Sequence, residues 1–311
     1  MLETTRTERL TRASDIVAES WIYRFSPAPV RPYLTLARVD RPIGTWLLLL
    51  PCWWGLALAG GGDARQSGYY ALLFAVGAFV MRGAGCVWND ILDRSYDARV
   101  ARTARRPIAS GEVSVIAAGI FMAALCASGL AVLLQFNGFT VAIAIASLGL
   151  VALYPLMKRF TYWPQAWLGL TFNWGALVGW SAITGSLDAP VLYLYGAGIF
   201  WTLGYDTIYA HQDKEDDALI GVRSTALLFG DRTKPWVAGF YAVALLMLGM
   251  AGHAAGMGTF YYAGLGFGAL QLAWQVLKLD TSDPQDCLAK FKSNRSFGLL
   301  IAAFLAAAQS W

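Results

Sequence analysis

The feature that most constrains this chain is a succession of apolar windows separated by short polar breaks. The windows fall near 43–60, 69–88, 113–134, 138–157, 165–184, 189–209, 235–254, 257–278 and 297–310. Most are close to the roughly 20 residues that an α-helix needs to cross a bilayer. Only 14% of the residues are charged, whereas soluble domains average about 25%. The sequence therefore predicts an all-α, polytopic membrane protein with nine transmembrane helices.

Positive charge is distributed very unevenly among the predicted loops. If the N-terminus is cytoplasmic, one face carries 22 of the 24 lysines and arginines, leaving Arg65 on the other face and Arg82 inside the second helix. Cytoplasmic loops of membrane proteins carry such an excess. Nearly all acidic residues share that face. We predict a cytoplasmic segment over residues 1–40 and a transmembrane domain over 41–311, with the chemistry at the cytoplasmic face.

A first acidic motif, NDILDRSYD, directly follows the apolar run of the second predicted helix. Asn89, Asp93 and Asp97 are four residues apart, so they project from one side of a helix as an oxygen-rich stripe. Asp90 lies beside them. The motif is predicted to end a helix at the cytoplasmic face.

A second acidic motif, YDTIYAHQDKEDD, follows the sixth window. Asp206, Asp213 and Asp217 recur at intervals of seven and four, and we expect them to share a helix face as well. In the two motifs, at 89–97 and 206–217, the pair Asp93 and Asp97 and the pair Asp213 and Asp217 stand 120 residues apart. This repeat indicates a transmembrane domain of two loosely repeated halves.

Carboxylates this close together repel one another unless a cation neutralises them. Hard oxygen ligands suit Mg²⁺, which keeps several waters and typically bridges to phosphate oxygens. The two motifs therefore predict Mg²⁺ and a diphosphate substrate. The alternative is a set of solvated loop acids balanced by neighbouring arginines.

Basic residues surround the acids on the same face. Arg102 and Arg106 lie in RTARRPIASGE, and Lys158 and Arg159 end the fourth window in YPLMKR. Guanidinium and ammonium groups are suited to holding phosphate oxygens. The alternative interpretation is that these residues only fix the membrane orientation.

Arg82 differs because it lies within an apolar window. It precedes Asn89 by seven residues, which places it about two turns and roughly 10 Å deeper on the same helix. Such an arginine is costly in a membrane and usually faces the interior of the bundle. It is either one half of a structural pair or the group that captures a substrate anion, such as an aromatic carboxylate.

Taken together, NDILDRSYD, RTARRPIASGE, YPLMKR and YDTIYAHQDKEDD resemble the UbiA family of intramembrane prenyltransferases over about residues 35–300. DRPIGTWLLLLPCWWG at 40–55 and GVRSTALLFG at 221–230 are most similar to the branch that prenylates para-hydroxybenzoate (4-hydroxybenzoate) in ubiquinone biosynthesis. The resemblance implies nine helices around a central cavity under a cytoplasmic cap, with a polyprenyl diphosphate donor. It implies the inner membrane of a bacterium, or the mitochondrial inner membrane in a eukaryote.

The resemblance also implies a role for each motif residue. Asn89, Asp93 and Asp97 would hold one Mg²⁺, and Asp213 with Asp217 the other. Asp90 and Asp206 would be supporting acids near the acceptor, and Arg82 would contact the acceptor carboxylate; these three are the predicted catalytic residues. Lys158 and Arg159 would bind the diphosphate. The other predicted substrate-binding residues are Tyr154, Tyr209, Arg102 and Arg106.

Several alternatives stay open at this stage. Other branches of the family use haem, naphthoate or chlorin acceptors. The CDP-alcohol phosphotransferases also place aspartates at membrane helix ends, but their DGxxAR motif is absent. A cation transporter would bury its acids near the middle of the bilayer, whereas these acids lie at predicted helix ends. Nucleic-acid partners are not expected, because the basic residues are explained by topology.

The charge imbalance yields a direct test of orientation. A cysteine introduced in place of Arg102 should react with an impermeant thiol reagent only from the cytoplasmic side, or its matrix equivalent. The same substitution at Arg65, on the opposite predicted face, is the matched control. Labelling of both positions from the same side would overturn the predicted topology.

Overall fold

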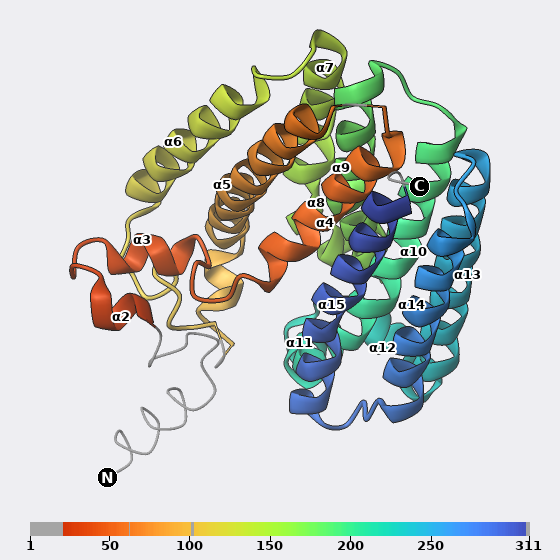
Figure 1. The fold of residues 1–311 in the computed structure, drawn as a ribbon. Coiled ribbons are helices and arrows are strands. Elements are labelled where there is room, and N and C mark those ends of the chain that lie inside the picture. The colour runs from red at the N-terminus through yellow and green to blue at the C-terminus, as the bar shows by residue number, and fades with distance from the viewer. Residues whose placement is uncertain (1–20, 62, 101–102, 309–311) are drawn as a thin grey trace. The chain divides into compact units, whose positions relative to one another are not determined.

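The protein is described here from a computed structural model that covers residues 21–61, 63–100 and 103–308. Within these ranges every regular element is a helix (Figure 1). The chain divides into two compact units, which are described separately. Unit 1 comprises the chain up to Thr45 together with Gly77–Val132, and unit 2 comprises Trp46–Val76 and Leu133–Trp311.

Unit 1 contains the short helices α2 (Trp21–Phe25) and α3 (Arg31–Leu36), the start of α4 (Ile43–Ala59), the C-terminal part of α5 (Ala64–Asp97) and α6 (Val115–Leu133). Helix α5 runs without interruption for 34 residues. Its last turns include the whole first acidic motif. The prediction that Arg82, Asn89 and the aspartates lie on one helix is therefore confirmed.

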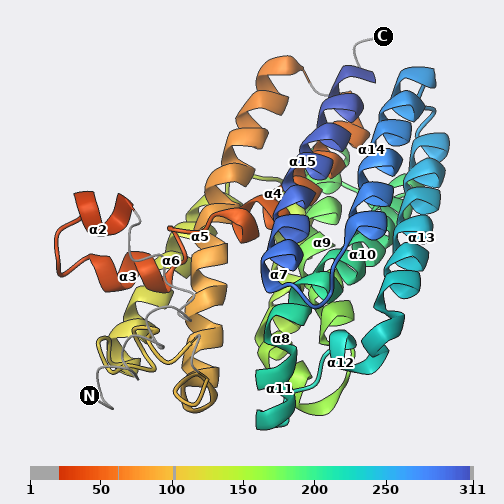
Figure 2. The same cartoon turned by 90° about the horizontal axis from the view of Figure 1, so that it is seen from below.

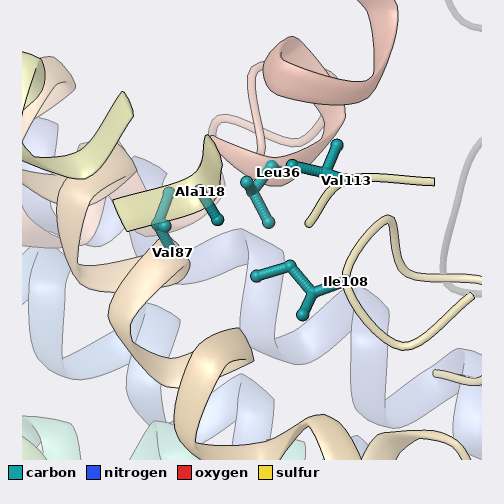
Figure 3. Close-up of a cluster of buried hydrophobic side chains, with 5 residues drawn as sticks. All are labelled: Leu36, Val87, Ile108, Val113 and Ala118. Atoms are coloured by element: carbon teal, nitrogen blue, oxygen red, sulfur yellow. The ribbon is translucent and has the colours of Figure 1, made fainter. Parts of the chain in front are cut away.

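A small apolar cluster holds the pieces of unit 1 together (Figure 3). Leu36 of α3 and Val87 of α5 are fully buried against Ala118 of α6, and Ile108 and Val113 join them from the loop after α5. Burying such side chains stabilises the fold by roughly 1.5–3 kcal/mol each. The cluster thus fixes the loop that carries Arg106 relative to the end of α5.

Unit 2 is a bundle of long helices connected by short ones. Its elements are the remainder of α4 and α5, then α7 (Gly138–Ala146), α8 (Leu148–Phe160), α9 (Pro164–Thr184), α10 (Ala189–Ala210), η1 (His211–Asp213), α11 (Lys214–Ile220), α12 (Thr225–Phe229), η2 (Gly230–Arg232), α13 (Thr233–Ala254), α14 (Thr259–Lys278) and α15 (Pro284–Ala308). Helix α10 packs against α9 and α13, and α14 packs against α13 and α15. Figures 1 and 2 both show α13, α14 and α15 side by side.

Small residues let helices of unit 2 approach closely. A Cβ atom added to Gly55 of α4 would lie 2.9 Å from the backbone nitrogen of Trp180 on α9. A Cβ atom on Gly179 of α9 would lie 2.9 Å from the backbone nitrogen of Leu56. Helix association in membranes depends on such close packing, because lipid tails are as apolar as the side chains they replace.

Each of the nine predicted windows falls on helix in the described part of the chain, but three differ in extent. The window at 69–88 is part of α5, which extends from Ala64 to Asp97. The window at 138–157 is divided at Ser147, whose hydroxyl donates to the carbonyl of Ala144 at 2.6 Å. The last window becomes the second half of α15, which begins at Pro284. That helix starts earlier because polar residues such as Lys290 and Asn294 are buried against neighbouring helices.

The outer surface of both units is rich in exposed apolar side chains. On α6, Ile116 and Ile120 are 77% and 68% exposed, and on α14, Leu270 and Leu277 are 68% and 77% exposed. Among the described residues, four segments are long and apolar enough to cross a membrane, namely Ala64–Asp97, Val115–Leu133, Gly138–Phe160 and Thr225–Ala254. The fold is that of a membrane protein with lipid-facing helices. The predicted count of nine crossings stays a prediction.

Candidate functional site

The last turns of α5 form a carboxylate-rich helix end. Asp93 is fully buried, Asp97 is buried and Asn89 is half-buried. Charged side chains are almost never fully buried unless they are paired. This helix end is therefore built to hold cationic groups against its carboxylates.

The best defined of these contacts centre on Asp90, which is only 1% exposed. Nη2 of Arg38 donates to both carboxylate oxygens of Asp90, at 2.8 and 2.9 Å. Nη1 of Arg106 donates to Oδ1 of the same carboxylate at 3.2 Å. Asp90 thus joins a segment before α4 and the loop after α5 to the helix between them.

Arg38 was not among the predicted site residues. Its backbone has a φ of +58°, in the left-handed region that few non-glycine residues adopt. The guanidinium also donates from Nη1 to the carbonyl of Thr35 at 3.2 Å. An unusual backbone conformation next to a buried charge is characteristic of functional sites. The sequence signal that could have identified Arg38 is its position two residues before the DRPIG segment.

Arg106 bridges two acids of the first motif. Besides Asp90, its Nη1 donates to Oδ1 and Oδ2 of Asp97 at 3.1 and 3.0 Å. The Thr103 hydroxyl donates to the backbone carbonyl of Asp97 at 3.0 Å and ties the loop to the helix end. Arg106, predicted to bind substrate, is therefore a counter-ion of the motif. Arg102, which was also predicted to bind substrate, lies outside the described residues.

The second acidic motif has a different local structure from the one predicted. Asp206 belongs to α10, Asp213 ends the short 3₁₀ helix η1, and Asp217 belongs to α11. The expectation that these three acids share the face of one helix was wrong, because α10 ends at Ala210 and the 3₁₀ helix η1 separates it from α11. Each acid is half-buried.

His211 explains part of this break. Its Nε2 lies 2.9 Å from the hydroxyl of Thr233, which donates its own proton to the carbonyl of Gly230 at 2.8 Å. The ring therefore donates from Nε2. Burial, together with the nearby Lys214 ammonium, lowers the pKa of the imidazole to about 4. A neutral ring anchors η1 to the start of α13 without adding positive charge beside Asp213.

The predicted basic pair Lys158 and Arg159 occupies the last turn of α8, where cations complement the helix dipole. Tyr154 lies one turn earlier than Lys158 on the same helix. Arg223, which follows the second motif, binds this helix end instead of standing free. Its backbone nitrogen donates to the carbonyl of Lys158 at 2.9 Å and its Nη1 donates to the carbonyl of Phe160 at 2.7 Å.

Aromatic side chains pack beside the second motif in unit 2. The ring of Tyr209 lies 4.3 Å from that of Phe291, centroid to centroid, and Tyr205 lies 5.0 Å from Trp201. The hydroxyl of Tyr205 accepts a hydrogen bond from Thr202 at 3.1 Å. Tyr205 is buried and serves packing, whereas Tyr209 is half-buried.

The first motif presents only oxygen donors, the ligand type that Mg²⁺ prefers. Amide and carboxylate oxygens stand at one-turn intervals on one continuous helix, from Asn89, Asp93 and Asp97. The two aspartates are buried. Within the described part of the chain, no three His, Cys, Asp or Glu side chains converge as a complete metal cage. Mg²⁺ is commonly bound by one or two carboxylates together with water and substrate phosphates.

A bundle of lipid-facing helices with buried carboxylates and arginines at a helix end defines the class of an intramembrane enzyme or ion-binding protein. Comparison with known families decides between these. Residues 48–306 match the model of the UbiA prenyltransferase family. The chain belongs to this family, so the transporter and CDP-alcohol phosphotransferase alternatives are set aside.

Curated relatives are identical to this chain at about half of the aligned positions. A protein of Bos taurus named 4-hydroxybenzoate polyprenyltransferase, mitochondrial, is 53% identical over 89% of this chain and 75% of its own length. Proteins of the same name from Homo sapiens and Arabidopsis thaliana are 50% and 51% identical, over 92% and 91% of this chain and 77% and 70% of their own length.

Solved structures share the fold. A UbiA homolog from Aeropyrum pernix K1 superposes with a TM-score of 0.68 at 24% identity, covering 85% of this chain and 96% of that one. A homolog from Archaeoglobus fulgidus, determined with GPP and Mg²⁺ bound, gives a TM-score of 0.64 at 19% identity over 90% of this chain and all of that one. The predicted all-α UbiA fold is confirmed.

The Asp90 contacts predict which arginine supports the site. Arg38→Ala should lower the free energy of unfolding by about 2–3 kcal/mol, less than the full cost of breaking a buried ion pair because Arg106 still contacts Asp90. The exposed Arg94, which donates to the Ile91 carbonyl at 3.1 Å, supplies the control. Arg94→Ala should change stability by under about 0.5 kcal/mol. Equal effects of the two substitutions, in denaturant unfolding in detergent, would contradict the assignment.

Proposed function

We propose that this chain transfers a polyprenyl group from polyprenyl diphosphate to the ring carbon ortho to the hydroxyl of 4-hydroxybenzoate, as a step of ubiquinone biosynthesis. The observation that carries the proposal is identity of 50–53% with relatives of that name over 89–92% of this chain. Such similarity favours the hydroxybenzoate acceptor over the haem, naphthoate and chlorin acceptors of other branches. The mitochondrial names of these relatives favour the mitochondrial inner membrane and give no support to the bacterial placement.

The acceptor is held through its carboxylate by Arg82. This half-buried arginine lies inside α5, seven residues before Asn89, and seven residues of helix turn through nearly two full circles. Its guanidinium therefore points to the same side of the helix as the oxygen stripe, but deeper. A planar guanidinium matches a carboxylate with two parallel hydrogen bonds, and burial strengthens them.

The donor is held through its diphosphate. Asn89, Asp93 and Asp97 would bind one Mg²⁺, and Asp213 with Asp217 would bind the other. When bound, Mg²⁺ supplies positive charge that neutralises the departing diphosphate. Lys158, Arg159 and Arg106 contribute further positive charge to the diphosphate oxygens, and Arg102 is proposed to do the same. Tyr154 and Tyr209 present ring faces that stabilise an allylic cation.

In the reaction the bond between the prenyl carbon and the diphosphate oxygen breaks, and a bond between that carbon and the aromatic ring forms. The ring then loses one proton and regains its aromaticity. Asp206 remains a supporting acid near the acceptor in this proposal. Asp90, whose two oxygens already accept from Arg38 and Arg106, acts by positioning these arginines.

The metal assignment predicts separate losses for the two motifs. Asp93→Asn and Asp213→Asn should each abolish turnover and weaken Mg²⁺-dependent binding of a prenyl diphosphate, because each removes one negative oxygen donor. Asp63→Asn is the matched control, since Asp63 caps the start of α5 by accepting from the Gln66 backbone. Donor binding should be measured directly, without acceptor. Full donor binding in EDTA, or in either motif variant, would contradict the assignment.

The acceptor assignment predicts a selective effect of Arg82. Arg82→Ala should weaken the apparent affinity for 4-hydroxybenzoate by about 1.5–3 kcal/mol, the worth of a hydrogen bond to a charged group. The KM for the prenyl donor should stay unchanged. Arg65→Ala, at the exposed start of the same helix, is the control. A folded Arg82→Ala enzyme with normal acceptor affinity would refute the carboxylate contact.

A further inference from the structure

The guanidinium of Arg82 lies directly over a glycine of unit 1. Gly44 is the second residue of α4 and is buried. A Cβ atom placed on it would lie 2.8 Å from Nη2 and 2.9 Å from Cζ of Arg82, with Nε closer still. These are the three nearest heavy atoms around the missing side chain. The arginine head therefore occupies the volume that any other residue at position 44 would fill.

The backbone alone gives no reason for this glycine. Gly44 is helical and is not among the glycines with positive φ. A glycine inside a helix costs about 1 kcal/mol relative to alanine. The glycine is explained by the Arg82 guanidinium, which occupies the space over its Cα. Only a residue without a side chain leaves that space open.

We infer that Gly44 is a positioning residue that fixes the Arg82 guanidinium for recognition of the acceptor carboxylate. This inference rests on the proposed function of Arg82. Alanine at position 44 would push the head aside by on the order of 1 Å, because non-bonded heavy atoms prefer separations of about 3.5–4 Å. Paired hydrogen bonds to a carboxylate depend on the orientation of the guanidinium plane. Gly44 thereby contributes to acceptor affinity without touching the acceptor.

The first experiment compares Gly44→Ala with wild-type enzyme. The KM for 4-hydroxybenzoate should rise about tenfold, as expected when charge-assisted hydrogen bonds lose their best geometry. The KM for the prenyl donor should stay unchanged. Neither kcat nor the temperature of unfolding should fall. Affinity for the uncharged methyl ester of 4-hydroxybenzoate should be the same in both proteins. Gly119→Ala is the matched control, because nothing lies within 4 Å of a Cβ atom there.

A double-mutant cycle with Arg82→Ala completes the test. If Gly44 acts through Arg82, adding Gly44→Ala to Arg82→Ala should raise the acceptor KM no further. If Gly44→Ala alone is unstable, the Arg82→Ala background should restore folding, since the clashing head is gone. Instability in both backgrounds, or an undiminished effect on KM in both, would overturn the inference.

The outcomes also separate this inference from the function on which it rests. A normal acceptor KM for Gly44→Ala beside a raised one for Arg82→Ala would refute the role of Gly44 alone. A normal acceptor KM for Arg82→Ala would refute the proposed carboxylate contact itself.

Discussion

The organisation of unit 1 depends on one buried carboxylate. Asp90 accepts hydrogen bonds from Arg38 and Arg106, which come from opposite sides of α5 in the sequence. Burying the charge of Asp90, or that of either arginine, would cost free energy if the group were unpaired. The three groups are therefore fixed together. The apolar cluster of Leu36, Val87 and Ile108 packs the same loop against the helices of unit 1. Polar pairing and apolar burial thus fix the same end of α5, where the first acidic motif stands.

This arrangement changes the interpretation of the basic residues. In the sequence, Arg106 and its neighbours were equally explained by membrane orientation or by substrate binding. The structure gives Arg106 a further role, because it bridges Asp90 and Asp97. In the proposed site, a metal ion held by Asp97 would compete with this guanidinium for the same carboxylate oxygens. The proposed contact of Arg106 with the diphosphate would then replace its contact with Asp97.

Most of the fold followed from the sequence because the bilayer permits few solutions: each apolar window has to be a helix with its backbone satisfied internally. The structure differs from the prediction where hydropathy does not reveal a helix boundary. Ser147 divides two apolar helices without any polar break, and the first half of α15 is buried although Lys290 and Asn294 are polar. Lys290 is accommodated by Asp286 at 2.6 Å and by the ring of Trp274. The helical placement of the first motif was predicted correctly because one helix carries the whole motif. Arg38 was missed because its partner lies 52 residues away, and the second motif was misjudged because a 3₁₀ turn interrupts its helix.

The proposed chemistry makes a particular demand on the product, since the new bond must form at the ring carbon beside the hydroxyl. The most direct measurement supplies the purified enzyme with a polyprenyl diphosphate and 4-hydroxybenzoate that is deuterated at both carbons ortho to the hydroxyl, and determines the product by mass spectrometry. The account predicts one prenyl group added, one of the two deuterons lost, and one diphosphate released per product. A prenylated product that keeps both deuterons, or no product with this acceptor, would contradict it.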